Sequence, residues 1–216
     1  MMANAFLIKT PVEFNFSLCL DYLRRSPKEV LHRCGEEHVS KLVRLNDKEV
    51  LFELRGAKKN RLQVTVLNQT SLNIVQSDLE DYIHEWFDLK TDLKPFYALT
   101  KKDPLLKDVT KKFHGYRIVG QPDLFESLIW AVLGQQINLQ FAYTLKQRFV
   151  EQFGEKLVYG NESFYLFPKP ETVAVLTDND LLPLQFSRQK SKYVIYTNFA
   201  IYFYFKLIIQ ILEVRC

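Results

Sequence analysis

Two adjacent glutamines, Gln135 and Gln136, are the residues of this 216-residue chain whose type and position best suit molecular recognition. They follow Gly134 at the expected end of one helix, and Asn138 is a good cap for the next. Carboxamides at an exposed helix–helix corner can hydrogen-bond to base edges or fill a gap left in a stack of bases. The alternative is that they only cap the preceding helix, and spacing alone favours this simpler interpretation.

Metal and cofactor chemistry is not expected. His32, Cys34 and His38 could be ligands, but a structural zinc site usually needs four, and a β-hairpin explains their spacing. The three cysteines, which include Cys19 and Cys216, are too few for the four thiolates of an iron–sulfur cluster. Walker-type and dinucleotide-binding glycine loops are missing. The sequence therefore predicts no cofactor and no metal.

A helical pattern begins at Asp123 and positions the two glutamines. Asp123, with Glu126 three residues later, resembles a capping box. The expected apolar stripe of this helix consists of Leu124, Leu128, Ile129 and Val132. A second helix is expected over 139–153, closed by Gly154, and a later one from about Ser187. The pattern therefore places residues 135–138 at a helix–helix junction.

The first ninety residues predict a mixed α and β domain. A strand at 6–9 and a helix at 16–25 precede an alternating pattern typical of an antiparallel meander with one buried face. The expected strands are 30–33, 39–45, 50–54 and 62–66. A further helix is expected from a cap at Ser77 or Asp78 to Leu89. The predicted fold class is α+β, with an antiparallel sheet in the N-terminal domain.

Residues 90–117 are rich in positive charge. Seven lysines and Arg117 outnumber three aspartates there, and Pro95 and Pro104 act as breakers. One interpretation is a solvated connector with short helices, and the other is a basic surface that contacts phosphates. The whole chain has a formal charge of +4, which permits a polyanionic partner without requiring one.

The composition also predicts the compartment. Three cysteines without framework spacing fit a reducing cytosol. The first ten residues lack the charged and apolar regions of a signal peptide. We therefore expect a cytoplasmic protein.

The stretch from Gly115 to Gly154, with AVLGQQIN at 131–138, resembles the 3-methyladenine DNA glycosylase II family (AlkA-type) of the helix-hairpin-helix superfamily. The resemblance continues through Phe167-Pro168, Pro170 and residues 187–193, and it covers about residues 5–197. It implies an α+β domain over 1–112, followed over 113–197 by the first part of an all-α helix-hairpin-helix glycosylase domain.

The resemblance implies a monomeric DNA-repair enzyme that flips alkylated bases out of duplex DNA and cuts the N-glycosidic bond, with no metal and no membrane. Its DNA would be that of a bacterial nucleoid. The DNA-binding residues would be Gln135, Gln136, Ile137 and Asn138, with Gln136 at the position of the wedge that enters the base stack. Tyr22 matches an aromatic residue that helps line the base pocket, and packing in the N-terminal core is the alternative for it.

The sequence departs from the family where the chemistry should lie. The family's DNA anchor is a hairpin whose Gly-x-Gly backbone grips a phosphate, and no Gly-x-Gly occurs here. No acidic residue matches the family's catalytic Asp, so no catalytic residue is assigned. We therefore expect this chain to be inactive. A non-catalytic DNA-binding remnant is the alternative.

Residues 198–216 are expected to be an apolar tail unrelated to the family. An interrupted reading frame near Asn198 is the preferred explanation. A natural packing strand or helix is one alternative. A membrane anchor is another, although a spanning helix needs about 20 mostly apolar residues and Lys206 interrupts this run.

Overall fold

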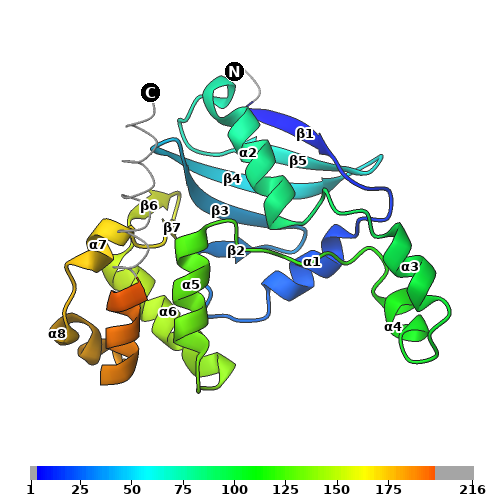
Figure 1. Cartoon of the computed structure of the whole chain (residues 1–216). Coiled ribbons are helices and arrows are strands. Elements are labelled where there is room, and N and C mark those ends of the chain that lie inside the picture. The colour runs from blue at the N-terminus through cyan, green and yellow to red at the C-terminus, as the bar shows by residue number, and fades with distance from the viewer. Residues whose placement is uncertain (1–3, 198–216) are drawn as a thin grey trace, which may run out of the picture. The chain divides into compact units, whose positions relative to one another are not determined.

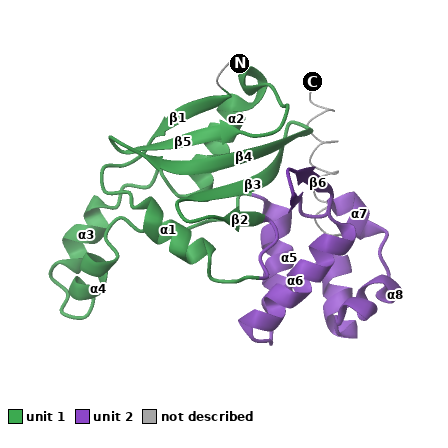
Figure 2. Ribbon diagram, turned by 180° about the vertical axis from the view of Figure 1, so that it is seen from behind, with its two compact units in different colours: residues 1–27, 32–122 green, residues 28–31, 123–216 purple. Residues whose placement is uncertain are grey.

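The computed structural model describes residues 4–197, so the tail expected at 198–216 lies outside the described residues. The chain forms two compact units (Figures 1 and 2). The first consists of the residues up to Pro27 together with His32–Pro122. The second consists of Lys28–Leu31 together with the residues from Asp123 onward. The predicted domain boundary at 112/113 stays a prediction about the family domains.

A five-stranded antiparallel sheet forms the centre of the first unit and confirms the predicted meander and the α+β class. Its strand order is β1-β5-β4-β3-β2 (Figure 1). The strands are β1 Ala5–Lys9, β2 His32–Cys34, β3 His38–Leu45, β4 Lys48–Ala57 and β5 Arg61–Val66. Asn46 and Asp47 join β3 to β4 with φ of 47° and 61°, because a two-residue hairpin turn of matching twist needs left-handed backbone at both positions.

Two helices complete the core of this unit. α1 (Phe16–Leu23) begins at Asn15, whose side chain accepts a hydrogen bond from the backbone N–H of Leu18 at 3.3 Å. α2 (Leu72–Trp86) contributes buried residues to the core on one side of the sheet. The predicted start of α2 at Ser77 or Asp78 is wrong. The helix begins earlier because Val75 extends its buried stripe N-terminally.

The basic stretch contains two short helices, α3 (Lys94–Thr100) and α4 (Lys107–Lys112). Pro95 lies in the first turn of α3 and starts this helix rather than breaking it, because a proline there loses no helical hydrogen bond. Short helices were expected here. The basic surface, however, does not include Arg117, which is only 1% exposed.

The second unit packs helices around a core that includes Ile129, Leu133, Phe149 and Val194. Its principal helices are α5 (Leu124–Gly134) and α6 (Leu139–Phe153). Shorter elements follow: α7 Pro170–Ala174, α8 Asp178–Leu181, a 3-10 turn at Leu182–Leu184, and a helix over 188–197. None of the helices within residues 4–197 has the length and hydropathy needed to cross a membrane.

Two expectations for the second unit are wrong. The chain is not helical throughout, because β6 (Lys156–Tyr159) and β7 (Glu162–Tyr165) form a hairpin around Gly160, whose φ is +59°. The stripe of α5 is also rotated from its predicted position. Leu124 and Leu128 are 56% and 37% exposed, while Phe125 and Leu133 are buried instead.

Candidate nucleic-acid interface

Both helices that flank residues 135–138 are capped as predicted. α5 begins at Asp123, whose side chain accepts a hydrogen bond from the backbone N–H of Glu126 at 2.7 Å. α6 begins at Asn138, whose side chain accepts one from the backbone N–H of Phe141 at 2.9 Å. These caps satisfy N–H groups that have no partner within a helix, so each helix start is well defined.

The four residues of this corner have different surroundings. The side chains of Gln135 and Gln136 are exposed, and neither carboxamide has a hydrogen-bond partner within residues 4–197. Ile137 is half-buried and packs against the core of the second unit, while the side-chain oxygen of Asn138 is engaged in its cap. The corner therefore presents two carboxamides on an anchored backbone.

Gln136 has a left-handed backbone, with φ of 57°. This conformation is uncommon for a residue with a side chain and costs about 1 kcal/mol or more, so the surrounding structure must maintain it. Tight reversal between two capped helices supplies that constraint. The direction in which the Gln136 side chain leaves the backbone is consequently set by the turn.

Lys190 holds the backbone on the N-terminal side of the corner by hydrogen bonds. Its ammonium group donates hydrogen bonds to the carbonyl oxygens of Val132 and Leu133 at 3.0 and 3.1 Å, and to that of Gln135 at 3.0 Å. These carbonyls lie at the C-terminal end of α5, where the helix dipole also favours a cation. Burial lowers the pKa of Lys190 because removal from water disfavours the charged form.

A second buried lysine links α5 and α6. The Lys146 ammonium lies 3.0 Å from Glu29 and 3.4 Å from Glu126, and all three side chains are almost completely buried. It also lies 5.2 Å from the ring centre of Trp130. Sequence reasoning did not single out this network. The available signal was a lysine on the apolar face of α6, between Ala142 and Phe149.

Tyr22, the predicted base-pocket residue, belongs to the first unit and lies on α1. It is half-buried, with its ring at 6.2 Å from that of Tyr116 in an edge-to-face arrangement. The guanidinium of Arg25 lies 3.8 Å from the centre of the Tyr22 ring. One face of the Tyr22 ring therefore makes a cation–π contact with Arg25. The role of Tyr22 at a base pocket stays a prediction.

The His32, Cys34 and His38 side chains have ordinary structural contacts. His32 Nε2 is 3.1 Å from the carbonyl oxygen of Leu23, and His38 Nε2 is 3.5 Å from the Glu53 carboxylate. In the part of the chain that the structure describes, no three histidine, cysteine, aspartate or glutamate side chains are grouped to hold a metal ion.

Arg117 is not part of the basic surface, because its guanidinium is buried in the first unit and bound there by three partners. It donates hydrogen bonds to the carbonyl oxygens of Asp88 and Thr91 and forms an ion pair with Glu13 at 2.7 Å. The sequence suggested an exposed charge. The structure corrects this because the partners of Arg117 lie far away in the sequence.

Within residues 4–197, the acidic side chains of the second unit are exposed or half-buried, apart from those of Glu29 and Glu126, which pair with Lys146. Asp180 accepts hydrogen bonds from the backbone N–H and hydroxyl of Thr177, at 2.8 and 2.7 Å, and these hold the pKa of Asp180 below its usual value. It acts as the partner in a capping box at the start of α8. We assign no catalytic residue, and the expectation that the family's catalytic Asp has no counterpart here stays a prediction.

Comparison with known families divides the chain into two successive matches. Residues 26–128 match the 8-oxoguanine DNA glycosylase N-terminal domain. Residues 129–201 match the HhH-GPD superfamily of base excision DNA repair proteins. The junction at 128/129 falls within α5.

Individual relatives agree with these matches. The chain is 40% identical over 195 residues to the DNA-3-methyladenine glycosylase of Bacillus subtilis, covering 89% of this chain and 64% of that protein. A 3-methyladenine DNA glycosylase from Archaeoglobus fulgidus has the same fold, with a TM-score of 0.75 at 19% identity over 89% of this chain and 66% of that one.

An 8-oxoguanine glycosylase/lyase of Clostridium acetobutylicum, solved with double-stranded DNA that contains cytosine opposite 8-oxoguanine, gives a TM-score of 0.65 at 19% identity. That match covers 92% of this chain and 66% of the solved one. The chain thus spans slightly less than two thirds of the relatives it matches. Its two consecutive domain matches and its identity to the Bacillus protein make the chain similar to base excision DNA repair proteins of the HhH-GPD superfamily, and to the 3-methyladenine glycosylases among them.

Proposed function

We propose that this protein takes part in base-excision repair of alkylated DNA, and that residues 1–216 by themselves bind duplex DNA but release little or no base. The observation that carries the proposal is the corner of residues 135–138. It presents two carboxamides that have no hydrogen-bond partner among the described residues, on a backbone held by Lys190 and Asn138. Carboxamides of this kind can replace hydrogen bonds lost when a base leaves the stack.

The expected lack of turnover rests on the sequence. The family's phosphate-gripping hairpin needs glycines at which the backbone can approach DNA closely, and no Gly-x-Gly occurs among the 216 residues. Within the described residues, the acidic side chains after Gly160 are Glu162 and Glu171, which are exposed, Asp178, which is half-buried, and Asp180, which takes part in a capping box. We propose Tyr22 as a contact for an alkylated base, because an aromatic ring attracts a cationic purine as it attracts the Arg25 guanidinium. The base would take the place of Arg25 on the Tyr22 ring.

One preparation of the chain tests both halves of the proposal. Base release is measured on methylated duplex DNA, and binding is measured by titration of a duplex that contains an abasic-site analogue. We expect binding and no release. Turnover that a carboxylate substitution within 1–216 abolishes would show that the active site lies in this sequence.

The corner is tested with Gln136→Gly, which removes the carboxamide but tolerates the left-handed backbone. We expect the preference for the abasic duplex over the intact duplex to fall about tenfold, as for the loss of one good amide contact to a base. Gln152→Ala on α6 removes an exposed carboxamide away from the corner and is the matched control. Equal effects of the two variants would contradict this placement.

The alternative function is non-catalytic, sequence-independent DNA binding by the basic surface. It predicts a steep loss of affinity with added salt, because phosphate contacts release counterions. It also predicts no preference for the abasic duplex and no effect of Gln136→Gly. The same titrations therefore separate the two functions.

A further inference from the structure

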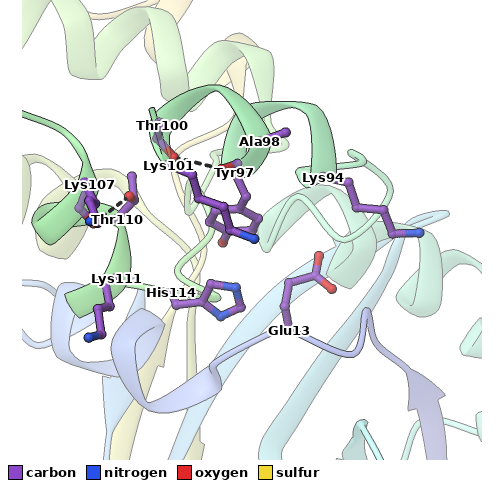
Figure 3. Close-up of a pocket in the computed structure, with 10 residues that line it drawn as sticks. All are labelled: Glu13, Lys94, Tyr97, Ala98, Thr100, Lys101, Lys107, Thr110, Lys111 and His114. Atoms are coloured by element: carbon purple, nitrogen blue, oxygen red, sulfur yellow. Dashed lines mark hydrogen bonds between the residues drawn. The ribbon is translucent and has the colours of Figure 1, made fainter. Parts of the chain in front are cut away.

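A cavity of about 470 Å³ lies in the first unit beside α3 and α4 (Figure 3). This volume is within the range of small-molecule binding sites. Its lining includes four lysines, Lys94 and Lys101 from α3 and Lys107 and Lys111 from α4. All four are exposed. Two separate helices thus bring their positive charges to one hollow.

The charge of this cavity is not compensated. The acidic residue that lines it is Glu13, which is already paired with the buried guanidinium of Arg117. The nearby Asp92 and Asp103 accept hydrogen bonds from backbone N–H groups at the starts of α3 and α4. None of the four lysines has an acidic partner within the part of the chain that the structure describes. An anion entering the cavity would therefore meet lysines from both helices that have no acidic partner among the described residues.

One wall of the cavity is rigid. The Tyr97 hydroxyl accepts a hydrogen bond from the backbone N–H of Gly115 at 3.0 Å, and the His114 ring stacks on Tyr97 with 4.5 Å between ring centres. Gly115 has φ of +84°, and a Cβ there would lie 1.8 Å from the Glu13 carbonyl oxygen, so only glycine fits. Because the wall is fixed before a ligand arrives, binding costs less conformational entropy.

We propose that this cavity binds phosphate esters, supplied by the backbone of a DNA strand or by a free nucleotide. Lysine ammonium groups recognise phosphate as point charges, and four of them at one hollow suit a ligand with more than one phosphate. The DNA source rests on the proposed function and would add a second contact, remote in sequence from residues 135–138. Binding there would be independent of base sequence, because the lysines would contact only the backbone.

The test is the double variant Lys101→Gln/Lys107→Gln, which removes one charge from each helix. The control is Lys48→Gln/Lys58→Gln, which removes two exposed lysines of the same unit that do not line the cavity. Circular dichroism establishes that both variants fold. For duplex DNA of random sequence, we expect the slope of log affinity against log salt to become shallower by about 2 for the cavity variant. The control slope should stay near that of the unaltered chain.

NMR spectra of the isotope-labelled chain distinguish the two phosphate sources. The amides of Thr100 and Gly115 report on the cavity during titrations with inorganic phosphate, a nucleoside diphosphate and a short duplex. Shifts with the nucleotide but not with DNA would support the site and assign it to free nucleotides. Shifts with DNA that disappear in the cavity variant would support the DNA source.

Two results would overturn the proposal: absence of shifts at these amides with every phosphate probe, or shifts that are the same in the cavity variant as in the unaltered chain. Equal DNA binding by the cavity and control variants would exclude the DNA source and leave the free nucleotide as the ligand. Failure of the proposed function has a different signature. In that case Gln136→Gly changes nothing and the abasic duplex is not preferred, whatever the result at the cavity.

Discussion

The two units each bury a cation that sequence reasoning did not place in the interior, and they compensate its charge differently. Arg117 in the first unit has a carboxylate partner, Glu13, in addition to two backbone carbonyls. Lys190 in the second unit has three carbonyl partners and no acidic partner within residues 4–197. The first arrangement is an ion pair that ties distant segments together, and the second is a helix cap.

This difference shows that a buried cation can serve two structural purposes. In the first unit, the guanidinium joins the chain near Glu13 to the loop after α2, so its loss would leave the half-buried Glu13 carboxylate unpaired. In the second unit, the ammonium holds the end of α5 and thereby the corner that we propose for DNA recognition. A substitution of Lys190 should consequently affect recognition as well as stability.

The comparison can be measured because each unit contains one tryptophan, Trp86 in the first and Trp130 in the second. Trp130→Phe and Trp86→Phe variants give a fluorescence signal from one unit at a time. Each stability prediction below uses the background that retains the tryptophan of the altered unit.

Arg117→Met has the largest expected effect. It should lower the free energy of unfolding of the first unit by about 3–4 kcal/mol, because the half-buried Glu13 carboxylate loses its partner and the Asp88 and Thr91 carbonyl oxygens lose their donor. The measurement is urea unfolding followed through Trp86. Arg61→Met removes an exposed arginine of β5 and should change stability by no more than about 0.5 kcal/mol. Similar changes in the free energy of unfolding for the two substitutions would contradict the structural role assigned to Arg117.

Lys190→Met comes next and should lower the free energy of unfolding of the second unit by about 2–3 kcal/mol. Two buried carbonyl oxygens and the part-buried one of Gln135 lose their donor. Unfolding is followed through Trp130. Lys192→Met changes an exposed lysine two residues away and is the control. A Lys190→Met chain of normal stability that still prefers the abasic duplex would contradict the anchoring role.

The ionisation of the Cys19 thiol, which lies near Arg117, should make the stability of the first unit depend on pH. Burial raises the pKa of the Cys19 thiol to about 11, although the nearby Arg117 acts in the opposite direction. The thiol stays protonated in the folded chain between pH 9 and 11 while it ionises in the unfolded chain. Stability is therefore retained below pH 9 and falls as the pH rises through this window, by about 2–3 kcal/mol in total.

Comparison with Cys19→Ala isolates this contribution from other groups that titrate at high pH. The difference in unfolding free energy between the two chains should shrink by that amount from pH 8.5 to 11. Thiol alkylation gives a second readout, since buried Cys19 should react more slowly than half-buried Cys34 at pH 8. Equal reaction rates would show that Cys19 is accessible.

The smallest expected effect concerns the other end of the corner. Asn138→Ala should destabilise the second unit by about 1 kcal/mol, because the first turn of α6 loses a capping acceptor. Asp123→Ala should cost a similar amount at α5 but should leave the preference for abasic DNA intact. Asn138→Asp keeps a capping oxygen, so the second unit of this variant should be about as stable as that of the unaltered chain. Its free energy of unfolding should therefore clearly exceed that of Lys190→Met.

Local sequence patterns were enough to predict much of the fold. The meander followed from alternation and from the Asn46-Asp47 turn, because side chains alternate between the two faces of a strand and these residues tolerate left-handed backbone. Asp123 and Asn138 were recognisable as caps, because their short polar side chains satisfy the first free N–H groups of a helix. The position of residues 135–138 between two helices was therefore predictable.

What the tertiary structure alone decided is which charges are buried. Arg117 and Glu13 are 104 residues apart, and Lys190 lies 55–58 residues from the carbonyls it binds, so no local pattern could reveal either pairing. The gathering of lysines from α3 and α4 at one cavity likewise depends on how the chain folds back. Burial of a charge is favourable only when distant groups supply its partners, and their positions come from packing rather than from sequence spacing.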